Sequence, residues 1–278
     1  MSTTFSRLAG PTASLSAADF SRAAKLLKQR SGILLGSHKH EGVARALGQQ
    51  ATRLNLDGPA DYLDYLQSHP QDDEWHVFIN AFTVNHTAFF RENHHFLILA
   101  DFLRERSVPL DIWTCAASTG EEAYSIAITL DETFGAASTN AHILATDIDT
   151  AAIKRARAGV YAFERVEALS EERLKRYFLR GTGNREGQVR VKPFLQKMVQ
   201  FGVLNLLDTV WPIEQQFDAI FCRNTLIYFD RPTQITVLER LAKMLKEGGL
   251  LFVGHSENFT YHTQQLRLRG QTVYEKAG

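Results

Sequence analysis

The second half of the chain alternates short apolar runs with helical patterns, and this alternation limits the folds that it can adopt. The expected strands are Leu110–Cys115, His142–Thr146, Phe217–Cys222 and Leu250–Val253. Helical patterns at Glu121–Leu130 and Ala151–Ala158 follow the first two strands. Strands that alternate with helices form a mostly parallel sheet covered on both faces. The sequence therefore predicts an α/β fold.

The spacing of apolar residues predicts the last helix and the last strands of the chain. Ile235, Leu238, Leu241 and Leu245 recur on one helix face, which predicts a helix before the last parallel strand. Leu266–Tyr274 is interpreted as one further strand. No helix separates it from the preceding strand, so we expect it to be antiparallel.

Residues 160–198 interrupt the alternation and predict a small inserted β-subdomain within a domain that spans residues 85–278. Glu171–Tyr177 is a short charged helix, and Arg180–Asn184 is rich in turn-forming residues. Gln188–Val191 alternates polar and apolar residues like a strand.

Residues 1–84 are expected to form a helical domain. Ser16 stands three positions before Asp19, which resembles a capping box and predicts a helix start. Val43, Leu47 and Ala51 share one face of a second predicted helix.

Composition excludes several protein classes. Hydrophobic residues make up 44% of the 278 residues, enough for a packed core rather than a disordered chain. Lys plus Arg equals Asp plus Glu at 31 each, so a strongly basic nucleic-acid binder is not expected. No apolar run reaches the ~18 residues that span a bilayer. The first residues also lack a secretory signal pattern. We therefore expect a cytoplasmic protein without membrane insertion.

Cysteine and histidine positions predict no metal site. Cys115 and Cys222 are too few for a disulfide framework and are expected to be buried core residues. His94 and His95, like His38 and His40, are expected to be solvated at polar helix ends, and no histidine spacing indicates metal ligands. His255 is the histidine expected nearest to the cleft.

Polar residues follow three of the expected strands, at the edge where open α/β sheets bind ligands. Ala117–Glu122 follows the first strand, Asp147 and Asp149 follow the second, and Arg223 with Asn224 follows the third. An isolated Asp is most simply a helix N-cap, the role that we assign to Asp149. Three such strand ends together predict a site for a nucleoside-type cofactor.

The loop after the first strand narrows the choice of cofactor. It holds only Gly120, whereas a dinucleotide site needs Gly-x-Gly-x-x-Gly, and the chain has no phosphate loop of a nucleotide triphosphatase. S-adenosylmethionine has a ribose but no pyrophosphate. A loop with one glycine and an acidic pair therefore favours S-adenosylmethionine over nicotinamide or flavin dinucleotides.

Six motifs occur in order along nearly the whole chain. They are Asn85–Glu92, Ala116–Ile126, Ala145–Asp149, Asn205–Leu207, Phe221–Phe229 and Gly254–Glu257. In this order they resemble the CheR family of chemotaxis receptor methyltransferases. The resemblance implies a helical N-terminal domain, a Rossmann-like class I methyltransferase sheet and an inserted β-subdomain. It also implies that Cys115 and Cys222 end neighbouring strands and stay reduced.

The resemblance further implies methyl transfer from S-adenosylmethionine to glutamate side chains of chemoreceptors, with S-adenosylhomocysteine as product. The implied cofactor-binding residues are Asn85, Thr87, Arg91, Glu122, Asp147, Asn205, Leu206, Arg223 and Asn224. Arg91 and Tyr228 are the implied catalytic residues. In the implied roles, Glu122 contacts the methionine end, Asp147 the ribose, and Asn205 with Leu206 the adenine.

The residues agree with this chemistry. A glutamate carboxylate, with a pKa near ~4.3, is ionised at neutral pH and needs no general base. The protein must align the carboxylate oxygen, methyl and sulfur, and exclude water. Arg91 can hold the substrate carboxylate through paired hydrogen bonds, and the alternative for Arg91 is an ion pair with Glu92. The alternative for Tyr228 is an ordinary core aromatic.

The implied partner is the cytoplasmic domain of chemoreceptors, to which a monomeric enzyme is recruited at the membrane. The first 70 residues carry eight Lys or Arg against five acids, a difference of +3, and Arg45 and Arg53 share a helix face that suits acidic receptor helices. The loop Arg180–Gly187 resembles that of members that bind a C-terminal receptor peptide. We expect Gln188–Val191 to be an exposed edge strand that accepts such a peptide, apart from the active site.

Two other functions stay open from the sequence. The cleft could belong to a non-catalytic protein that senses the cofactor, although Arg91 and Tyr228 favour catalysis. Another S-adenosylmethionine-dependent transferase could act on a small molecule or nucleic acid. Arg223–Leu226 does not form the Asn/Asp-Pro-Pro-Tyr element that a nucleic-acid enzyme would carry.

Overall fold

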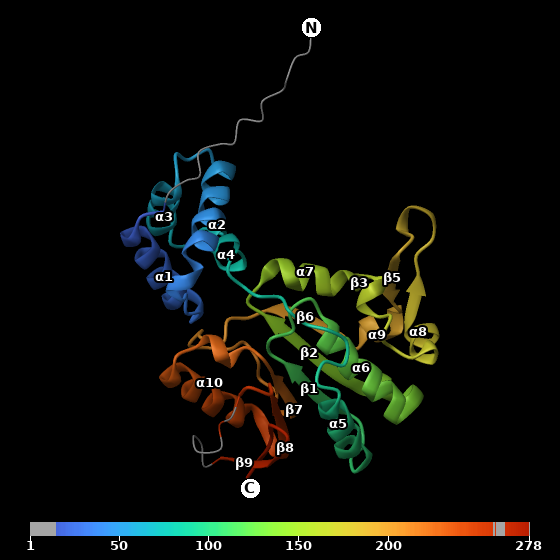
Figure 1. Ribbon diagram of the computed structural model, residues 1–278. Coiled ribbons are helices and arrows are strands. Elements are labelled where there is room, and N and C mark those ends of the chain that lie inside the picture. Colours follow the sequence, from blue (N-terminus) through green and yellow to red (C-terminus); the bar gives the residue numbers. More distant parts are fainter. Residues whose placement is uncertain (1–14, 258, 260–264, 278) are drawn as a thin grey trace. The chain divides into compact units, whose positions relative to one another are not determined.

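The computed structural model describes residues 15–257, 259 and 265–277 (Figure 1). The chain divides into two compact units, Met1–Thr83 and Val84–Gly278. Residues 1–14, which include Arg7 of the basic residues counted above, lie outside the described part.

The first unit is helical, as predicted. Its elements are α1 (Ala17–Ser31), η1 (Ser37–Lys39), α2 (His40–Arg53), α3 (Pro59–Ser68) and α4 (Glu74–Asn80). The Ser16 hydroxyl accepts a hydrogen bond from the Asp19 amide at 3.0 Å, which confirms the predicted cap of α1. Val43, Leu47 and Ala51 are buried on one face of α2, also as predicted.

A buried carboxylate lies inside this helical unit. Glu74 is 6% exposed and accepts hydrogen bonds from the Tyr62 hydroxyl, at 2.7 Å, and from the Arg53 guanidinium. Arg53 therefore neutralises an internal acid. This corrects the expectation that Arg53 and Arg45 form one free basic face, because Arg53 is paired with Glu74 whereas Arg45 is exposed.

The second unit is built on a seven-stranded sheet with the order β6-β2-β1-β7-β8-β10-β9. The strands are β1 (Leu110–Thr114), β2 (Ala141–Asp147), β6 (Val199–Val203), β7 (Phe217–Cys222), β8 (Leu245–Val253), β9 (Leu266–Gly270) and β10 (Val273–Lys276). The first five in this order pair in parallel, and β10 is antiparallel to both β8 and β9. The predicted α/β fold is confirmed.

Helices cover both faces of this sheet (Figure 1). They are α5 (His94–Arg104), α6 (Glu121–Phe134), α7 (Thr150–Ala158) and α10 (Arg231–Met244), with short turns η2 (Gly135–Asn140) and η5 (Leu226–Tyr228). Leu110 and Ile112 of β1 face the core cluster that contains α5 and α6, while Trp113 faces the cluster that contains α10. This alternation follows from the two-residue period of a strand.

Two local predictions are wrong at the end of the chain. Leu245 is buried, but it opens β8 rather than closing α10, because the helix ends at Met244. The predicted single strand is a hairpin, β9 and β10, since Gln271 and Thr272 turn the chain with positive φ angles of 49° and 59°.

The inserted segment forms a small separate sheet in the order β3-β5-β4, with all pairs antiparallel. Its elements are β3 (Val160–Ala162), η3 (Phe163–Arg165), α8 (Glu171–Tyr177), β4 (Phe178–Arg180), η4 (Gly183–Arg185), β5 (Gln188–Val191) and α9 (Pro193–Lys197). The expectation that Gln188–Val191 is an edge strand is wrong. It is the central strand, so β3 and β4 carry the free edges.

Among the described residues, no helix has the length and hydropathy needed to cross a bilayer.

Candidate functional site

The candidate site lies where three neighbouring strands end. β1 pairs with β2 on one side and with β7 on the other, so the segments that follow these strands meet at one edge of the sheet. The Ala117 amide donates to the Thr146 carbonyl at 3.0 Å, which brings the loop after β1 onto the end of β2. The predicted convergence of the three strand ends is therefore present.

The loop after β1 makes a tight turn into α6. Ser118 and Gly120 have positive φ angles of 49° and 99°. A Cβ atom on Gly120 would lie 2.8 Å from the Ala156 Cβ and 3.0 Å from the Tyr161 hydroxyl. Only glycine suits both this conformation and this space. The single glycine of the loop thus lets α6 begin directly at the sheet edge.

Asp147 ends β2 inside this turn. Its carboxylate accepts hydrogen bonds from the Ser118 amide at 2.8 Å and from the Asp149 amide at 2.9 Å. Burial raises the pKa of the Asp147 carboxyl to about 6. Asp149 caps α7 by accepting from the Ala152 amide at 2.8 Å, which confirms its predicted role.

Asn85 ties the segment before α5 to both strand ends. Its side-chain nitrogen donates to Asp149 at 2.6 Å, and its side-chain oxygen accepts from the Ser118 hydroxyl at 2.8 Å. Two residues further on, the Thr87 carbonyl accepts from Arg165 of the inserted subdomain at 2.5 Å. This contact links the inserted subdomain to the segment that carries Asn85 and Thr87.

A buried charge network joins β7 to α6. Arg223 is 5% exposed, and its Nη1 donates to Glu122 Oε2 at 2.7 Å. Its Nη2 donates to the Arg91 carbonyl at 2.6 Å and lies 3.2 Å from Glu92 Oε2. The Thr114 hydroxyl donates to the other oxygen of Glu122 at 2.7 Å. One guanidinium therefore faces two carboxylates.

Asn224 adopts a positive φ of 57°, and Glu257 supports it. The Glu257 carboxylate accepts from the amides of Asn224 at 2.9 Å, Gly254 at 2.6 Å and Ile227 at 3.3 Å. Burial raises the pKa of Glu257. The sequence alone assigns no role to Glu257. Its place in the Gly254–Glu257 motif was the available signal.

The two expected catalytic residues lie in different surroundings. Arg91 Nη1 donates to the His86 carbonyl at 2.6 Å. Its alternative partner, Glu92, instead faces Arg223, so the Arg91–Glu92 ion pair considered from the sequence is not formed. Tyr228 lies in η5, half-buried, and packs at the border of the core cluster that contains Phe229.

Asn205 and Leu206 follow β6 and lie beside the end of β2. The Leu204 amide donates to the Asp147 carbonyl at 3.0 Å. Asn205 Oδ1 accepts from the Leu207 amide at 3.0 Å, which holds the turn, and Leu206 is buried. The structure thus places this pair next to the acid that is expected to hold the ribose.

His95 is fully buried, contrary to the expectation of a solvated histidine, because it lies in the first turn of α5 and its ring packs against Phe252. Its Nε2 lies 2.9 Å from the Gln271 carbonyl, so this nitrogen must donate. Its Nδ1 lies 3.6 Å from Glu92 Oε2. Burial and the charge of Arg223 lower the pKa of His95 to about 4.

Glu92, His94 and His95 bring potential metal-ligand atoms within 4.8 Å of one another. Arg223, 3.2 Å from Glu92 Oε2, already supplies a positive charge to this carboxylate. We therefore derive no metal chemistry from this group.

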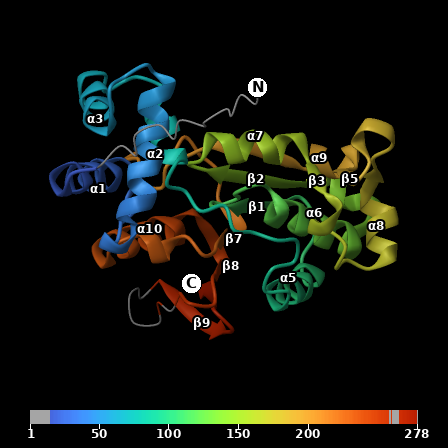
Figure 2. The same ribbon diagram turned by 45° about the horizontal axis from the view of Figure 1, so that its top comes forward.

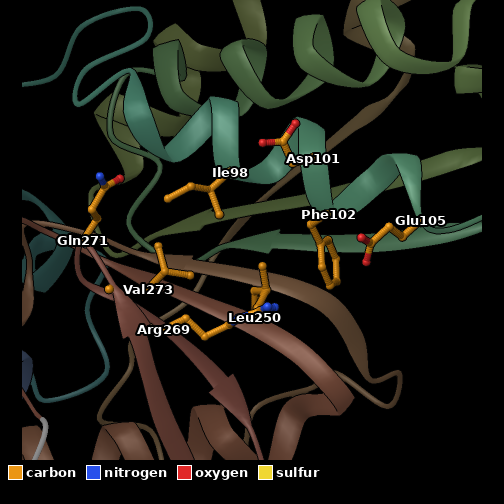
Figure 3. A pocket seen from close by; sticks show the side chains of 9 residues that line it. Ile98, Asp101, Phe102, Glu105, Leu250, Arg269, Gln271 and Val273 are labelled. Atoms are coloured by element: carbon orange, nitrogen blue, oxygen red, sulfur yellow. The ribbon is translucent and has the colours of Figure 1, made fainter.

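A separate hollow of about 480 Å³ lies between α5, β8 and the β9–β10 hairpin (Figure 3). Ile98 and Phe102 form part of its apolar wall, while Asp101, Glu105 and Arg269 add charge. None of the residues expected to hold the cofactor lines it.

Comparisons with known proteins match both units. Residues 85–275 match the family model described as CheR methyltransferase, SAM binding domain. Residues 18–83 match the model described as CheR methyltransferase, all-alpha domain. The chemotaxis protein methyltransferase of Klebsiella aerogenes is 50% identical over 94% of this chain and 90% of its own length. That of Escherichia coli strain K12 is 48% identical over 94% of this chain and 91% of its own length.

Proposed function

Since the chain belongs to the CheR methyltransferase family and carries its S-adenosylmethionine-binding domain, we propose that it methylates glutamate side chains of chemoreceptors. The product would be a glutamate methyl ester, which serves sensory adaptation. The observation that carries this proposal is the half-buried carboxylate of Asp147 beside the glycine turn into α6. This pairing suits a ribose next to a methionine chain.

The residues at the strand ends fit S-adenosylmethionine. Asp147 would accept the ribose hydroxyls, and Asn205 with Leu206 would border the adenine. Glu92 and Glu122 share the single guanidinium of Arg223, so this network keeps a net negative charge that suits a cationic ligand. When bound, S-adenosylmethionine supplies a methyl group activated by a sulfonium.

The chain itself would position the acceptor. Arg91, on the segment before α5, would hold the ionised substrate carboxylate, and Tyr228 would border the position of the transferred methyl. No protein base is required because the carboxylate is already ionised at neutral pH. Arg223 and Asn224 would shape the cleft, and Asn85 with Thr87 would close it from the joining segment. Excluding water from the two opposite charges favours transfer.

The test is incubation with labelled S-adenosylmethionine and membranes that carry chemoreceptors. Base-labile label on receptor protein is expected. Tyr228→Phe should lower the rate while S-adenosylhomocysteine still binds, and Arg91→Lys should also lower the rate. Binding without any transfer would favour the cofactor-sensing alternative, and label only on nucleic acid or small molecules would refute a receptor substrate.

We further propose that a receptor peptide docks on the inserted subdomain, and that the enzyme is a cytoplasmic monomer recruited to membrane receptors. A hollow of about 240 Å³ is lined by apolar residues of both edge strands, Val160 and Leu179, and by Arg180, Arg185 and Arg190. The three arginines can meet a peptide carboxylate. An extended peptide would pair with a free edge, β3 or β4.

Gly181 offers a test of this docking site. A Cβ atom there would lie 2.0 Å from the Arg185 carbonyl oxygen, so Gly181→Val must reshape the loop. Receptor C-terminal peptides should bind the intact protein at micromolar concentration and lose affinity to Gly181→Val. Gly42→Val, at an open position in α2, is the control. Absence of binding to the intact protein would refute this docking role.

A further inference from the structure

Two side chains of the inserted subdomain reach the loop that is expected to receive the cofactor. Tyr161 comes from β3 and Arg165 from η3. The loop, residues 116–120, and the first turn of α6 lie about 40 residues earlier in the chain. The insertion is therefore joined to the cofactor loop by tertiary contacts, in addition to its chain connections.

Arg165 bridges two elements of the site. Its guanidinium donates to the Thr87 carbonyl at 2.5 Å and to the Glu121 carboxylate. Glu121 is 1% exposed, and its other oxygen accepts from the Thr119 hydroxyl at 2.6 Å. A buried carboxylate that loses its cationic partner is strongly disfavoured. Arg165 therefore holds the first turn of α6 in place.

Tyr161 fixes the loop itself. Its hydroxyl donates to the Thr119 carbonyl at 2.7 Å, and the side chain is 7% exposed. Its ring packs edge-on against Phe89 with centroids 5.2 Å apart. The same hydroxyl lies 3.0 Å from where a Gly120 Cβ would stand. Tyr161 thus fixes the position of the turn and limits the space beside Gly120.

The inserted subdomain also contacts the C-terminal end of α6. Arg176 Nη2 donates to Asp131 Oδ2 at 2.7 Å, and the Tyr177 hydroxyl donates to the same oxygen at 3.1 Å. Figure 2 shows α8 beside α6. These contacts anchor the insertion without touching the cofactor loop, so they provide a matched comparison for Arg165.

We propose that Arg165 and Tyr161 are positioning residues that hold the cofactor loop through Glu121, Thr87 and Thr119. The inserted subdomain is then part of the cofactor site as well as a docking module. This inference rests on the proposed function, because it takes the loop to contact S-adenosylmethionine.

The experiment measures S-adenosylhomocysteine affinity by calorimetry and the separate kcat and KM for S-adenosylmethionine. Arg165→Met should weaken S-adenosylhomocysteine binding about tenfold or more, the scale of losing one charged hydrogen bond. KM should rise in parallel, while kcat at saturating S-adenosylmethionine changes much less. Arg165→Lys should recover part of the affinity, and Tyr161→Phe should weaken binding to a smaller degree.

The matched control is Arg176→Met, which removes the same kind of ion pair from the far end of α6. It should keep S-adenosylhomocysteine affinity within about twofold of the intact protein. Equal affinities for Arg165→Met and the intact protein would overturn the inference. An equal loss in Arg176→Met would also overturn it, since that loss would indicate general destabilisation of α6. Failure of the intact protein to bind S-adenosylhomocysteine would instead overturn the proposed function.

Discussion

Arg223 Nη1 and Glu122 Oε2 lie 2.7 Å apart, and both residues are buried. They are 101 positions apart in the chain, and their bond joins the end of β7 to the first turn of α6. Arg223 also faces Glu92, 3.2 Å away. A single guanidinium thus holds three segments of the candidate site together.

Substitutions that break this charge network should lower the unfolding free energy by unequal amounts. Arg223→Met leaves two carboxylates without their cation and should cost about 3–5 kcal/mol of unfolding free energy. Glu122→Gln should cost less, because Arg223 keeps Glu92. Urea denaturation of both single variants and the double variant gives the coupling energy. Additive losses would contradict a direct interaction.

S-adenosylhomocysteine affinity should depend on the ionisation of Asp147, whose pKa burial raises to about 6. Ribose hydroxyls donate to the carboxylate, so affinity should fall about tenfold between pH 7 and pH 5 as Asp147 takes up a proton. Asp147→Asn should bind more weakly at pH 7, by about 1.5–3 kcal/mol, and lose this pH dependence. Calorimetry with an unchanged pH profile in Asp147→Asn would disprove the ribose assignment.

The raised pKa of Asp147 has the opposite effect on the stability of the protein without ligand, because the charged form that binds ribose is the form that burial disfavours. The folded pKa of Asp147 lies above its ordinary value of 3.8. Its contribution to stability is therefore fully present below about pH 4 and is lost as pH rises through about 6. The stability of the intact protein relative to Asp147→Asn should therefore rise as pH falls from 8 to 4, whatever the constant cost of replacing an oxygen that accepts a backbone amide. Urea denaturation at the two pH values measures this difference.

Cys115 and Cys222 should remain reduced and react slowly in the folded protein. The Cys115 amide donates to the Phe221 carbonyl at 2.9 Å, which confirms that the two cysteines end neighbouring strands. A hydrogen bond with Cys115 and burial raise the pKa of the Cys222 thiol well above its usual value. Thiol titration should find two free cysteines after unfolding and almost none under native conditions. Fewer than two after unfolding would contradict the prediction.

Charge reversal at two arginines of α2 should have different effects. Arg45 is exposed, so Arg45→Glu should slow methylation of acidic receptor helices at low salt and leave S-adenosylhomocysteine binding intact. Arg53→Glu should instead lower the unfolding free energy by about 1–3 kcal/mol, because it leaves the buried Glu74 without its partner. Thermal melts separate the two. An unchanged methylation rate for Arg45→Glu at low salt would end this assignment.

The sequence by itself determined β1, β2 and β7 and the polar residues that follow them. Apolar runs with a two-residue or helical period depend on neighbours in the chain, so β1, β2 and β7 could be predicted with the acid and glycine at their ends. The Asp149 cap was predictable for the same reason, since a cap involves residues only three positions apart.

Only the tertiary structure decided which partners these residues take. The ion pairs of Arg223 with Glu122 and of Arg53 with Glu74, and the central place of β5, depend on segments that are distant in sequence. Arg165 shows the physical reason. A buried carboxylate requires a nearby cation, but the sequence alone does not indicate which arginine supplies it. That choice is made when the inserted subdomain packs against α6.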